Sequence, residues 1–286
     1  MPARLLSALR GRPGLWLLAL LLLPPSPALA QELFILKFLG GFFERKAPVP
    51  KPGPSAPPTP GATSEDQFQA LLLSSDLTAL NQACLEAASF NFERRLRLLQ
   101  QRLLVLAPPP QPFDQVLLNA NALLSCRAPD GALQVLNRFS PASGQQRQQW
   151  LVMRWRAANA GLHHQLAAEA LQQLAEGDLA HLELIPLPLK LRDDGSLATR
   201  PALDVYADHL LALGRPEQAA AALLSGRIGG QLAAERLQLA VSLLPKLSWQ
   251  QRDQLLEQAL DQAAAAEAWG LALTLLADQQ RLLALE

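Results

Sequence analysis

The stretch at residues 203–224, LDVYADHLLALGRPEQAAAALL, decides the fold of this chain. It holds two apolar helical segments separated by Gly214-Arg215-Pro216, where glycine favours the end of one helix and proline the first turn of the next. Two helices joined by so short a turn run antiparallel. The small residues Ala207 and Ala219 would let the two helices approach closely, so the stretch predicts a packed helical hairpin.

Two earlier stretches follow the same plan, VLLNANALLSCRAPDGALQVL at 116–136 and LVMRWRAANAGLHHQLAAEAL at 151–171. Each contains an apolar helix, a turn and a second helix that opens with alanine. The corresponding alanines are Ala132, Ala167 and Ala219. Four positions after each comes a leucine: Leu136, Leu171 and Leu223. Twelve positions before each come Ala120, Trp155 and Ala207. The first two alanines are 35 residues apart and the last two 52, which predicts a repeat with an insertion at about 182–200.

These stretches resemble the tetratricopeptide-repeat proteins of bacteria. The residues that carry the resemblance are Leu203, Tyr206, Ala207, Leu210, Gly214, Ala219 and Leu223. The chain departs from the family pattern in its variable unit lengths, in the leucine at the usual aromatic position 223, and in the lack of a closing proline. Segments 65–107 and 230–286 fit only as generic helix pairs. The resemblance implies an all-α fold, an α-solenoid of stacked antiparallel helix pairs over 64–286.

Composition also favours helix. Leu, Ala and Gln dominate, aromatic residues make up 5% of the chain, and β-branched residues are scarce, so most side chains lose little rotamer freedom in a helix. Capping boxes begin at Ser64, Ser143 and Ser248. Four prolines are expected in first helical turns: Pro112, Pro129, Pro201 and Pro216.

Residues 1–30 read as a secretory signal peptide. Arg4, Arg10 and Arg12 precede an apolar run at 15–23 that is too short to span a bilayer, and Ala28-Leu29-Ala30 fits a cleavage site. An uncleaved anchor is the alternative. The signal predicts export to the periplasm, or to the thylakoid lumen if the source is a cyanobacterium.

Residues 31–46 form a short apolar segment that cannot cross a membrane. Its apolar residues could enter a membrane interface, dock into a groove, or pack as a first helix on the chain's own core: Leu33, Phe34, Phe38, Phe42 and Phe43. Seven prolines lie between Pro48 and Pro60, so residues 47–63 are predicted to be a semi-rigid linker. An apolar tip on such an arm favours contact with a partner or a membrane surface.

Charge is balanced overall but unevenly distributed. Residues 90–156 hold nine arginines against three acidic residues, whereas residues 157–286 hold nine basic against sixteen acidic residues. The density is too low for a nucleic-acid footprint, so no nucleic-acid partner is expected. The sharpest basic cluster comprises Arg94, Arg95, Arg97 and Arg102. It is either a solvated helix face or a contact for an acidic partner segment or anionic lipid.

The two cysteines permit one disulfide in an oxidising compartment. Cys84 lies in the first helix of the leading pair and Cys126 near the end of the corresponding helix of the next pair. These helices stack side by side in a solenoid, so the sequence leaves open a bond between repeats or two buried thiols.

The insertion contains the hairpin-type turn Asp194-Gly195, and its prolines disfavour a regular central strand. It is expected to be an ordered loop or small ribbon, or a binding loop. The histidines lack the spacing of a metal site: His163, His164, His181 and His209. His163-His164 is interpreted as a solvated pair. No cofactor is implied.

The sequence therefore predicts an exported, non-catalytic helical-repeat scaffold that binds a protein segment in the cell envelope, its partner another envelope protein. Two other classes stay open, a self-assembling or membrane-attached structural component and a ligand carrier or enzyme with an unrecognised site. The sequence does not set the oligomeric state.

Overall fold

The computed structural model describes residues 63–106, 110–191 and 196–283. These residues all fall within one compact unit, Ala56–Glu286. The predicted signal peptide, the apolar segment at 31–46 and the linker up to residue 62 lie outside the described residues. Within the described residues, no helix has the length and apolar character needed to cross a membrane.

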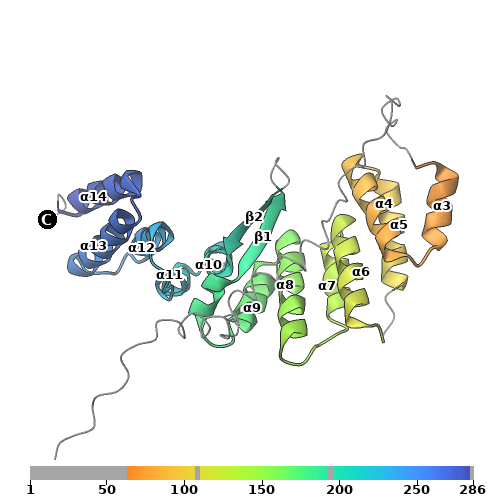
Figure 1. The fold of residues 1–286 in the computed structure, drawn as a ribbon, viewed down its shortest axis with the longest axis horizontal. Helices are drawn as coiled ribbons and strands as arrows, with labels where there is room; N and C mark the ends of the chain where they lie inside the picture. Colours follow the sequence, from red (N-terminus) through yellow and green to blue (C-terminus); the bar gives the residue numbers. More distant parts are fainter. Residues whose placement is uncertain (1–62, 107–109, 192–195, 284–286) are drawn as a thin grey trace, which may run out of the picture. The chain divides into compact units, whose positions relative to one another are not determined.

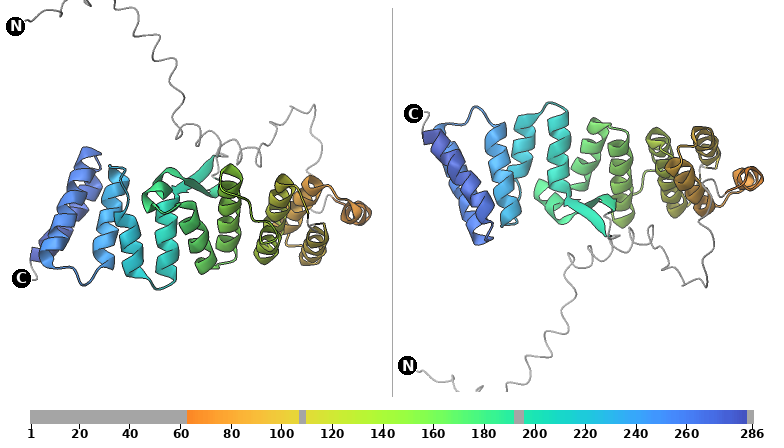
Figure 2. Two further views of the ribbon diagram at one scale, coloured as in Figure 1. Left: turned by 90° about the horizontal axis from the view of Figure 1, so that it is seen from below. Right: turned by 90° about the horizontal axis from the view of Figure 1, so that it is seen from above.

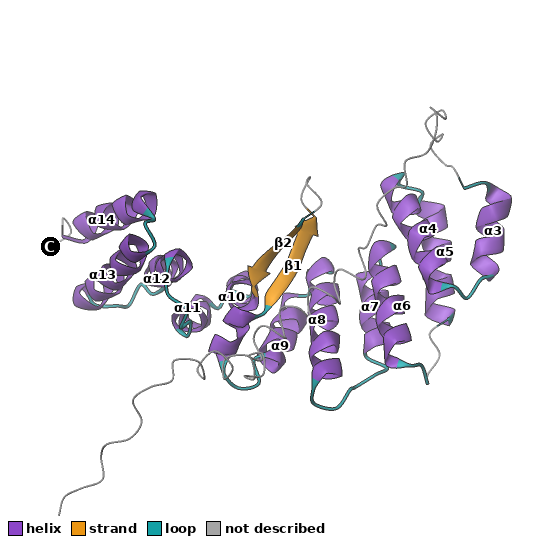
Figure 3. Ribbon diagram, viewed as in Figure 1, coloured by secondary structure: helices purple, strands orange, loops and turns teal. Residues whose placement is uncertain are grey.

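The described chain is mainly helical, as predicted (Figure 1, Figure 3). Its first helices are α3 (Glu65–Leu73), α4 (Leu77–Ser89), α5 (Glu93–Val105), α6 (Phe113–Ser125), α7 (Pro129–Leu136), α8 (Gln145–Ala160) and α9 (His164–Leu174). After the insertion come α10 (Ala202–Ala212), α11 (Pro216–Leu224), α12 (Gln231–Leu243), α13 (Trp249–Ala265) and α14 (Trp269–Leu283). Each helix packs against its neighbours in the chain, and Figure 2 shows them side by side from two further directions.

One turn recurs in five helix pairs. It joins α4 to α5, α6 to α7, α8 to α9, α10 to α11 and α13 to α14, and in each case one residue adopts a left-handed conformation: Asn91, Arg127, Leu162, Gly214 and Glu267, with φ of 55°, 57°, 58°, 70° and 56°. The N–H of the following residue donates to the carbonyl five residues back over 2.8–2.9 Å. This hydrogen bond is the Schellman motif, which satisfies carbonyls at the helix end and reverses the chain.

The recurring turn places the same small side chains at each pair. Five residues after the left-handed position come Ala132, Ala167, Ala219 and Ala272, all buried, with Leu96 in the first pair. The predicted alignment of Ala132, Ala167 and Ala219 is thus part of a longer series. The last member, Ala272, was not predicted, because no glycine or proline lies within two residues of Glu267, whereas Pro129, Gly161 and Gly214 mark the other three turns. Close helix approach follows from these alanines.

The insertion folds as a short 3-10 helix, η1 (Leu179–Leu184), and a two-stranded antiparallel ribbon, β1 (Pro186–Leu191) and β2 (Leu197–Pro201). The expected small ribbon is confirmed, although its turn at Asp194-Gly195 lies outside the described residues. The pairing is irregular between Pro188 and Lys190. Leu187 is fully buried, so the ribbon is anchored to the core between α9 and α10.

Two of the three predicted capping boxes are present. The Ser64 and Ser248 hydroxyls accept from the N–H groups of Gln67 and Gln251, whose side chains accept in return. The prediction at Ser143 is wrong, because α8 begins one residue later with Gly144 as its N-cap. Pro129 and Pro216 occupy first turns as expected, whereas Pro112 and Pro201 are the N-cap residues of α6 and α10.

The two cysteines have disulfide geometry. Their Sγ atoms are 1.99 Å apart and their Cα atoms 4.6 Å apart, joining the middle of α4 to the C-cap of α6. The bond closes a loop of 42 residues, and constraint of the unfolded chain by such a loop is worth about 4 kcal/mol in the chain-entropy model. It links the pair α4–α5 to the pair α6–α7 through their first helices.

At the left-handed turn positions, introducing a glycine should stabilise the fold and removing one should destabilise it. Leu162→Gly should raise the free energy of unfolding by about 0.5–1 kcal/mol, because Leu162 is exposed and its Cβ is strained at positive φ. Gly214→Ala should lower it by about 1 kcal/mol through that strain alone, since an added Cβ there meets nothing within 4 Å. Urea unfolding followed by circular dichroism measures both. A destabilised Leu162→Gly protein would contradict this account of the turn.

Candidate partner-binding surfaces

The predicted arginine cluster on α5 consists of two arginines that make contacts within the chain and two that are exposed. Arg95 lies between two aromatic rings, 4.8 Å from the Phe68 centroid and 5.4 Å from that of Phe92. Its guanidinium donates to the Thr63 carbonyl over 3.1 Å and to Glu65 over 3.3 Å. These contacts hold the start of α3 against α5, so Arg95 is occupied within the chain.

Arg102 is occupied in the same way at the other end of α3. Its guanidinium donates to the carbonyls of Leu73 and Ser74 over 2.9–3.1 Å. Helix carbonyls at a C-terminus lack intrahelical partners and carry partial negative charge, so a cation there caps the helix. α3 buries only Phe68, and the two arginines therefore supply much of its attachment.

The remaining two arginines of the cluster, Arg94 and Arg97, are exposed. Arg94 borders a shallow hollow of about 290 Å³ together with Phe92 and Leu98. This pair is the part of the predicted cluster that is available to an acidic segment or to lipid phosphate.

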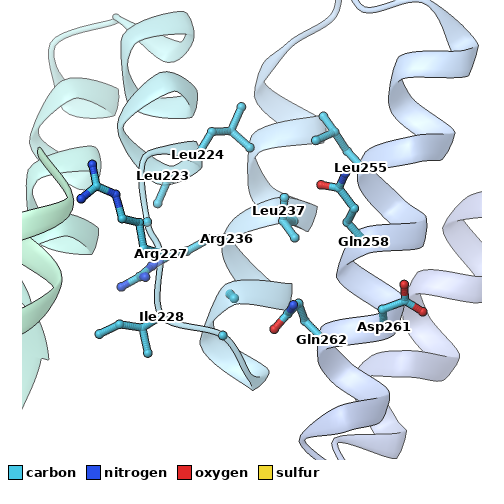
Figure 4. Close-up of a pocket in the computed structure, with 13 residues that line it drawn as sticks. Leu223, Leu224, Arg227, Ile228, Arg236, Leu237, Leu255, Gln258, Asp261 and Gln262 are labelled. Atoms are coloured by element: carbon cyan, nitrogen blue, oxygen red, sulfur yellow. The ribbon is translucent and has the colours of Figure 1, made fainter. Parts of the chain in front are cut away.

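A larger groove lies between α11, α12 and α13 (Figure 4). It has a volume of about 530 Å³. Leucines form its walls, and polar side chains of α13 line one edge: Leu223, Leu224, Leu237 and Leu255, with Gln258, Asp261 and Gln262. The extended segment 226–229 forms the opposite edge and contributes Arg227 and Ile228. Sequence reasoning missed this groove because its walls come from three helices.

The segment beside the groove is held by a buried ion cluster. Arg236 of α12 donates to Asp204 of α10 over 2.6 and 3.1 Å, and its other nitrogen pairs with Glu183 of η1. Glu183 also accepts from the backbone N–H groups of Arg227 and Ile228 over 2.6 and 3.1 Å. The cluster thus ties the insertion, α10 and α12 to one wall of the groove.

Two features stabilise this cluster: the opposite charges of its members and the lack of a side chain at Gly226. Burial by itself lowers the pKa of Arg236, but Asp204 and Glu183 outweigh burial and the pKa is raised. A Cβ at position 226 would lie 2.9 Å from both Arg236 Nη1 and Glu183 Oε1, so Gly226 lets the segment pass directly over the pair.

Trp155, His209 and His164 form a second buried polar chain, between α8, α9 and α10. The Trp155 indole N–H donates to His209 Nε2 over 3.1 Å, and the two histidine Nδ1 atoms are 3.1 Å apart. The neutral His209 ring therefore carries its proton on Nδ1 and donates to His164. The pKa of His209 is lowered to about 4, first by burial and second by His164, whereas Asp208 opposes both.

The interpretation of His163-His164 as a solvated pair is correct only for the first residue. His163 is exposed and its Nε2 lies 2.6 Å from Asp130, whereas His164 is half-buried beside His209. Sequence spacing gave no signal for this pairing, since His164 and His209 are 45 residues apart. No group of His, Cys, Asp and Glu able to hold a metal ion occurs in the described part of the chain.

The chain was compared with known proteins. No protein-family model, curated protein or solved structure matches it.

The ion cluster predicts an asymmetric mutational response. Arg236→Met should destabilise the fold by about 3–5 kcal/mol, because two buried carboxylates lose their counter-ion. Arg227→Met, which breaks only the exposed pair with Asp178, should cost about 0–1 kcal/mol. Urea unfolding distinguishes the two. Equal losses in both variants would show that the cluster is not the anchor described here.

The histidine chain predicts acid sensitivity. Between about pH 6.5 and pH 4 the unfolded His209 binds a proton that the folded ring does not, so stability should fall as pH falls, by up to about 3 kcal/mol. His209→Gln keeps an acceptor for Trp155 and does not titrate, so it should flatten this dependence. His181→Gln is the matched control and should keep the full slope. An unchanged slope in His209→Gln would exclude His209 as the titrating group.

Proposed function

We propose that this chain is an exported, non-catalytic α-solenoid of the tetratricopeptide-like kind that binds a segment of another cell-envelope protein. Five equivalent turns and the packing of each helix on its neighbours support a solenoid. In such folds, stacked helix pairs bury a continuous core and present grooves in which a peptide is held by shape and a few polar contacts.

Export is supported by two independent features. The first 30 residues have the charge, apolar length and small-residue motif of a signal peptide. The Cys84–Cys126 geometry is that of a disulfide, and structural disulfides persist in oxidising compartments such as the periplasm. The apolar residues between 33 and 46 are proposed to attach the exported protein to a membrane surface or a second component.

The groove between α11, α12 and α13 is the proposed binding site. The observation that carries this proposal is the combination of leucine walls with amide side chains along one edge. Leucine walls gain free energy by covering apolar side chains of a ligand. The amides of Gln258 and Gln262 can both donate to and accept from a peptide backbone. Arg227 and Asp261 place opposite charges at the two edges, which would orient the segment.

Arg94 and Arg97 are proposed as an accessory contact. They are exposed on α5, in the basic part of the chain, whereas the groove lies in the acidic part. A partner with an acidic stretch would be attracted to α5 and less so to the groove. Their contribution should therefore weaken with salt.

Site-specific photo-crosslinking in the native organism tests the proposal. A benzophenone side chain in place of Gln258 should give a light-dependent adduct with one envelope protein, and the recovered chain should begin at Gln31. The same probe at Gln165, an exposed glutamine of α9, is the matched control and should give no such adduct.

A charged substitution in the groove is the second part of this experiment. Leu224→Glu should abolish the adduct, because Leu224 lines the groove, whereas Leu85→Glu places the same charge on an exposed leucine of α4 and should leave it unchanged. Adduct formation from position 165, or an adduct that survives Leu224→Glu, would refute the groove as the binding site.

A further inference from the structure

The ribbon of the insertion has two outer edges that differ in what they can bind. β1 and β2 pair with each other, and no third strand joins them in the part of the chain that the structure describes (Figure 3). An edge strand presents backbone N–H and C=O groups to which another extended chain can bind. Which of these groups face outward follows from the register of the two strands.

The register shows that two residues of β2 turn their backbone groups away from β1. The Ala202 N–H donates to the Ile185 carbonyl over 2.8 Å, so the backbone at position 202 faces β1. Backbone groups alternate between the two sides of an extended strand, so the N–H and C=O groups of Leu197 and Thr199 face outward. Pro188 lies opposite Thr199 and has no N–H to donate across the ribbon, which agrees with this assignment.

Prolines block the edge of β1 but not that of β2. On β1 the outward positions before the irregular pairing are Pro186 and Pro188, which offer no donor to an added strand. On β2, Thr199 is exposed, and no other described element contributes a hydrogen bond to its backbone. The edge of β2 is therefore the one that can accept another strand.

The outward groups of β2 are complementary to those of a second β2. If two copies run antiparallel about a two-fold axis at Ala198, Leu197 of each copy lies opposite Thr199 of the other. Each of these two pairs exchanges two hydrogen bonds, so every outward N–H and C=O of the four residues is used. An axis at Thr199 would instead oppose Leu197 to Pro201, which has no N–H. The axis at Ala198 is thus the one that leaves no outward donor or acceptor of these residues unpaired.

Charge and side-chain size favour the same pairing. A two-fold contact brings each residue near its own copy, so like charges must be absent from it. Within residues 196–201 the one charged side chain is Arg200, which pairs with Asp208 of its own α10 over 2.6 Å. Ala198 faces its own copy in a non-hydrogen-bonded pair, where the two backbones are closest and a small side chain fits.

We propose that two copies of this chain associate through β2, with Ala198 on the two-fold axis, so that their ribbons form one four-stranded antiparallel sheet. A second copy is the occupant because β2 matches its own outward groups and carries no unpaired charge. The residues that line the α11–α13 groove all lie between 223 and 262, so this contact uses none of them. The association is therefore independent of the proposed partner site, and each dimer presents two such grooves.

A cysteine on the axis tests the pairing. In a non-hydrogen-bonded antiparallel pair the facing Cα atoms are about 4.5 Å apart, a separation that a disulfide spans. The purified full chain with Ala198→Cys, treated with a mild oxidant, should therefore give a dimer of twice the 31.0 kDa chain mass on a non-reducing gel. Cys84 and Cys126 are bonded to each other and buried, so they should not compete.

Thr199→Cys is the matched control. It places a cysteine on the same strand at a more exposed position, but the proposed pairing holds its two copies more than about 7 Å apart, beyond the reach of a disulfide. Its dimer yield should be at least about 10-fold lower than that of Ala198→Cys. Equal yields at the two positions would indicate random collision, or association through residues 33–46, and would overturn the proposal.

Two further changes in the Ala198→Cys chain separate strand pairing from folding. Thr199→Pro removes an N–H that the ribbon itself does not use, so it should lower the dimer yield at least about 10-fold with an unchanged circular dichroism spectrum. Thr199→Val keeps that N–H and should keep the yield. A dimer that survives Thr199→Pro would refute pairing through β2. An Ala198→Cys chain that stays monomeric would also refute it, and would leave this edge to an extended segment of another protein.

Discussion

The described fold depends on one hydrogen bond made five times. At each recurring turn, a left-handed residue allows the next N–H to reach the carbonyl five residues back. This fixes where the first helix ends and where the second begins, and the alanine or leucine five residues later is buried in every pair. Non-glycine residues occupy four of these five left-handed positions, which means that the hydrogen bond and the packing outweigh the strain of about 1 kcal/mol.

Where the insertion and α12 interrupt the succession of recurring turns, buried polar side chains hold the neighbouring elements together. The insertion between α9 and α10 carries Glu183, and α12, which lies between two of the recurring pairs, carries Arg236. Their contact, with Asp204 as a third member, fixes two departures from the repeat to each other. The groove borders this same place. The groove thus lies where the succession of recurring turns is interrupted.

Sequence patterns predicted the parts of this structure that depend on local chemistry. Gly214 and Pro216 mark a turn directly, and Ser64 and Ser248 mark helix starts, because the deciding contacts lie within a few residues. The turn at Glu267 escaped notice since nothing local distinguishes it. Arg95, Arg102 and Arg236 bind Glu65, Ser74 and Glu183, which are 28 to 53 residues away and whose positions follow from the packing. The same limit applies to the groove, whose lining residues come from α11, α12, α13 and the segment between α11 and α12.

The covalent link between α4 and α6 gives the described unit two unequal ends. In arrays of helix pairs each unit contacts mainly its neighbours, so thermal opening begins at the termini and moves inward. The Cys84–Cys126 bond holds the first two pairs together even when their packing opens, whereas the pair α13–α14 is retained by non-covalent contacts alone. Fraying is therefore directional, and the C-terminal helices are the part of this unit that a protease would cut first.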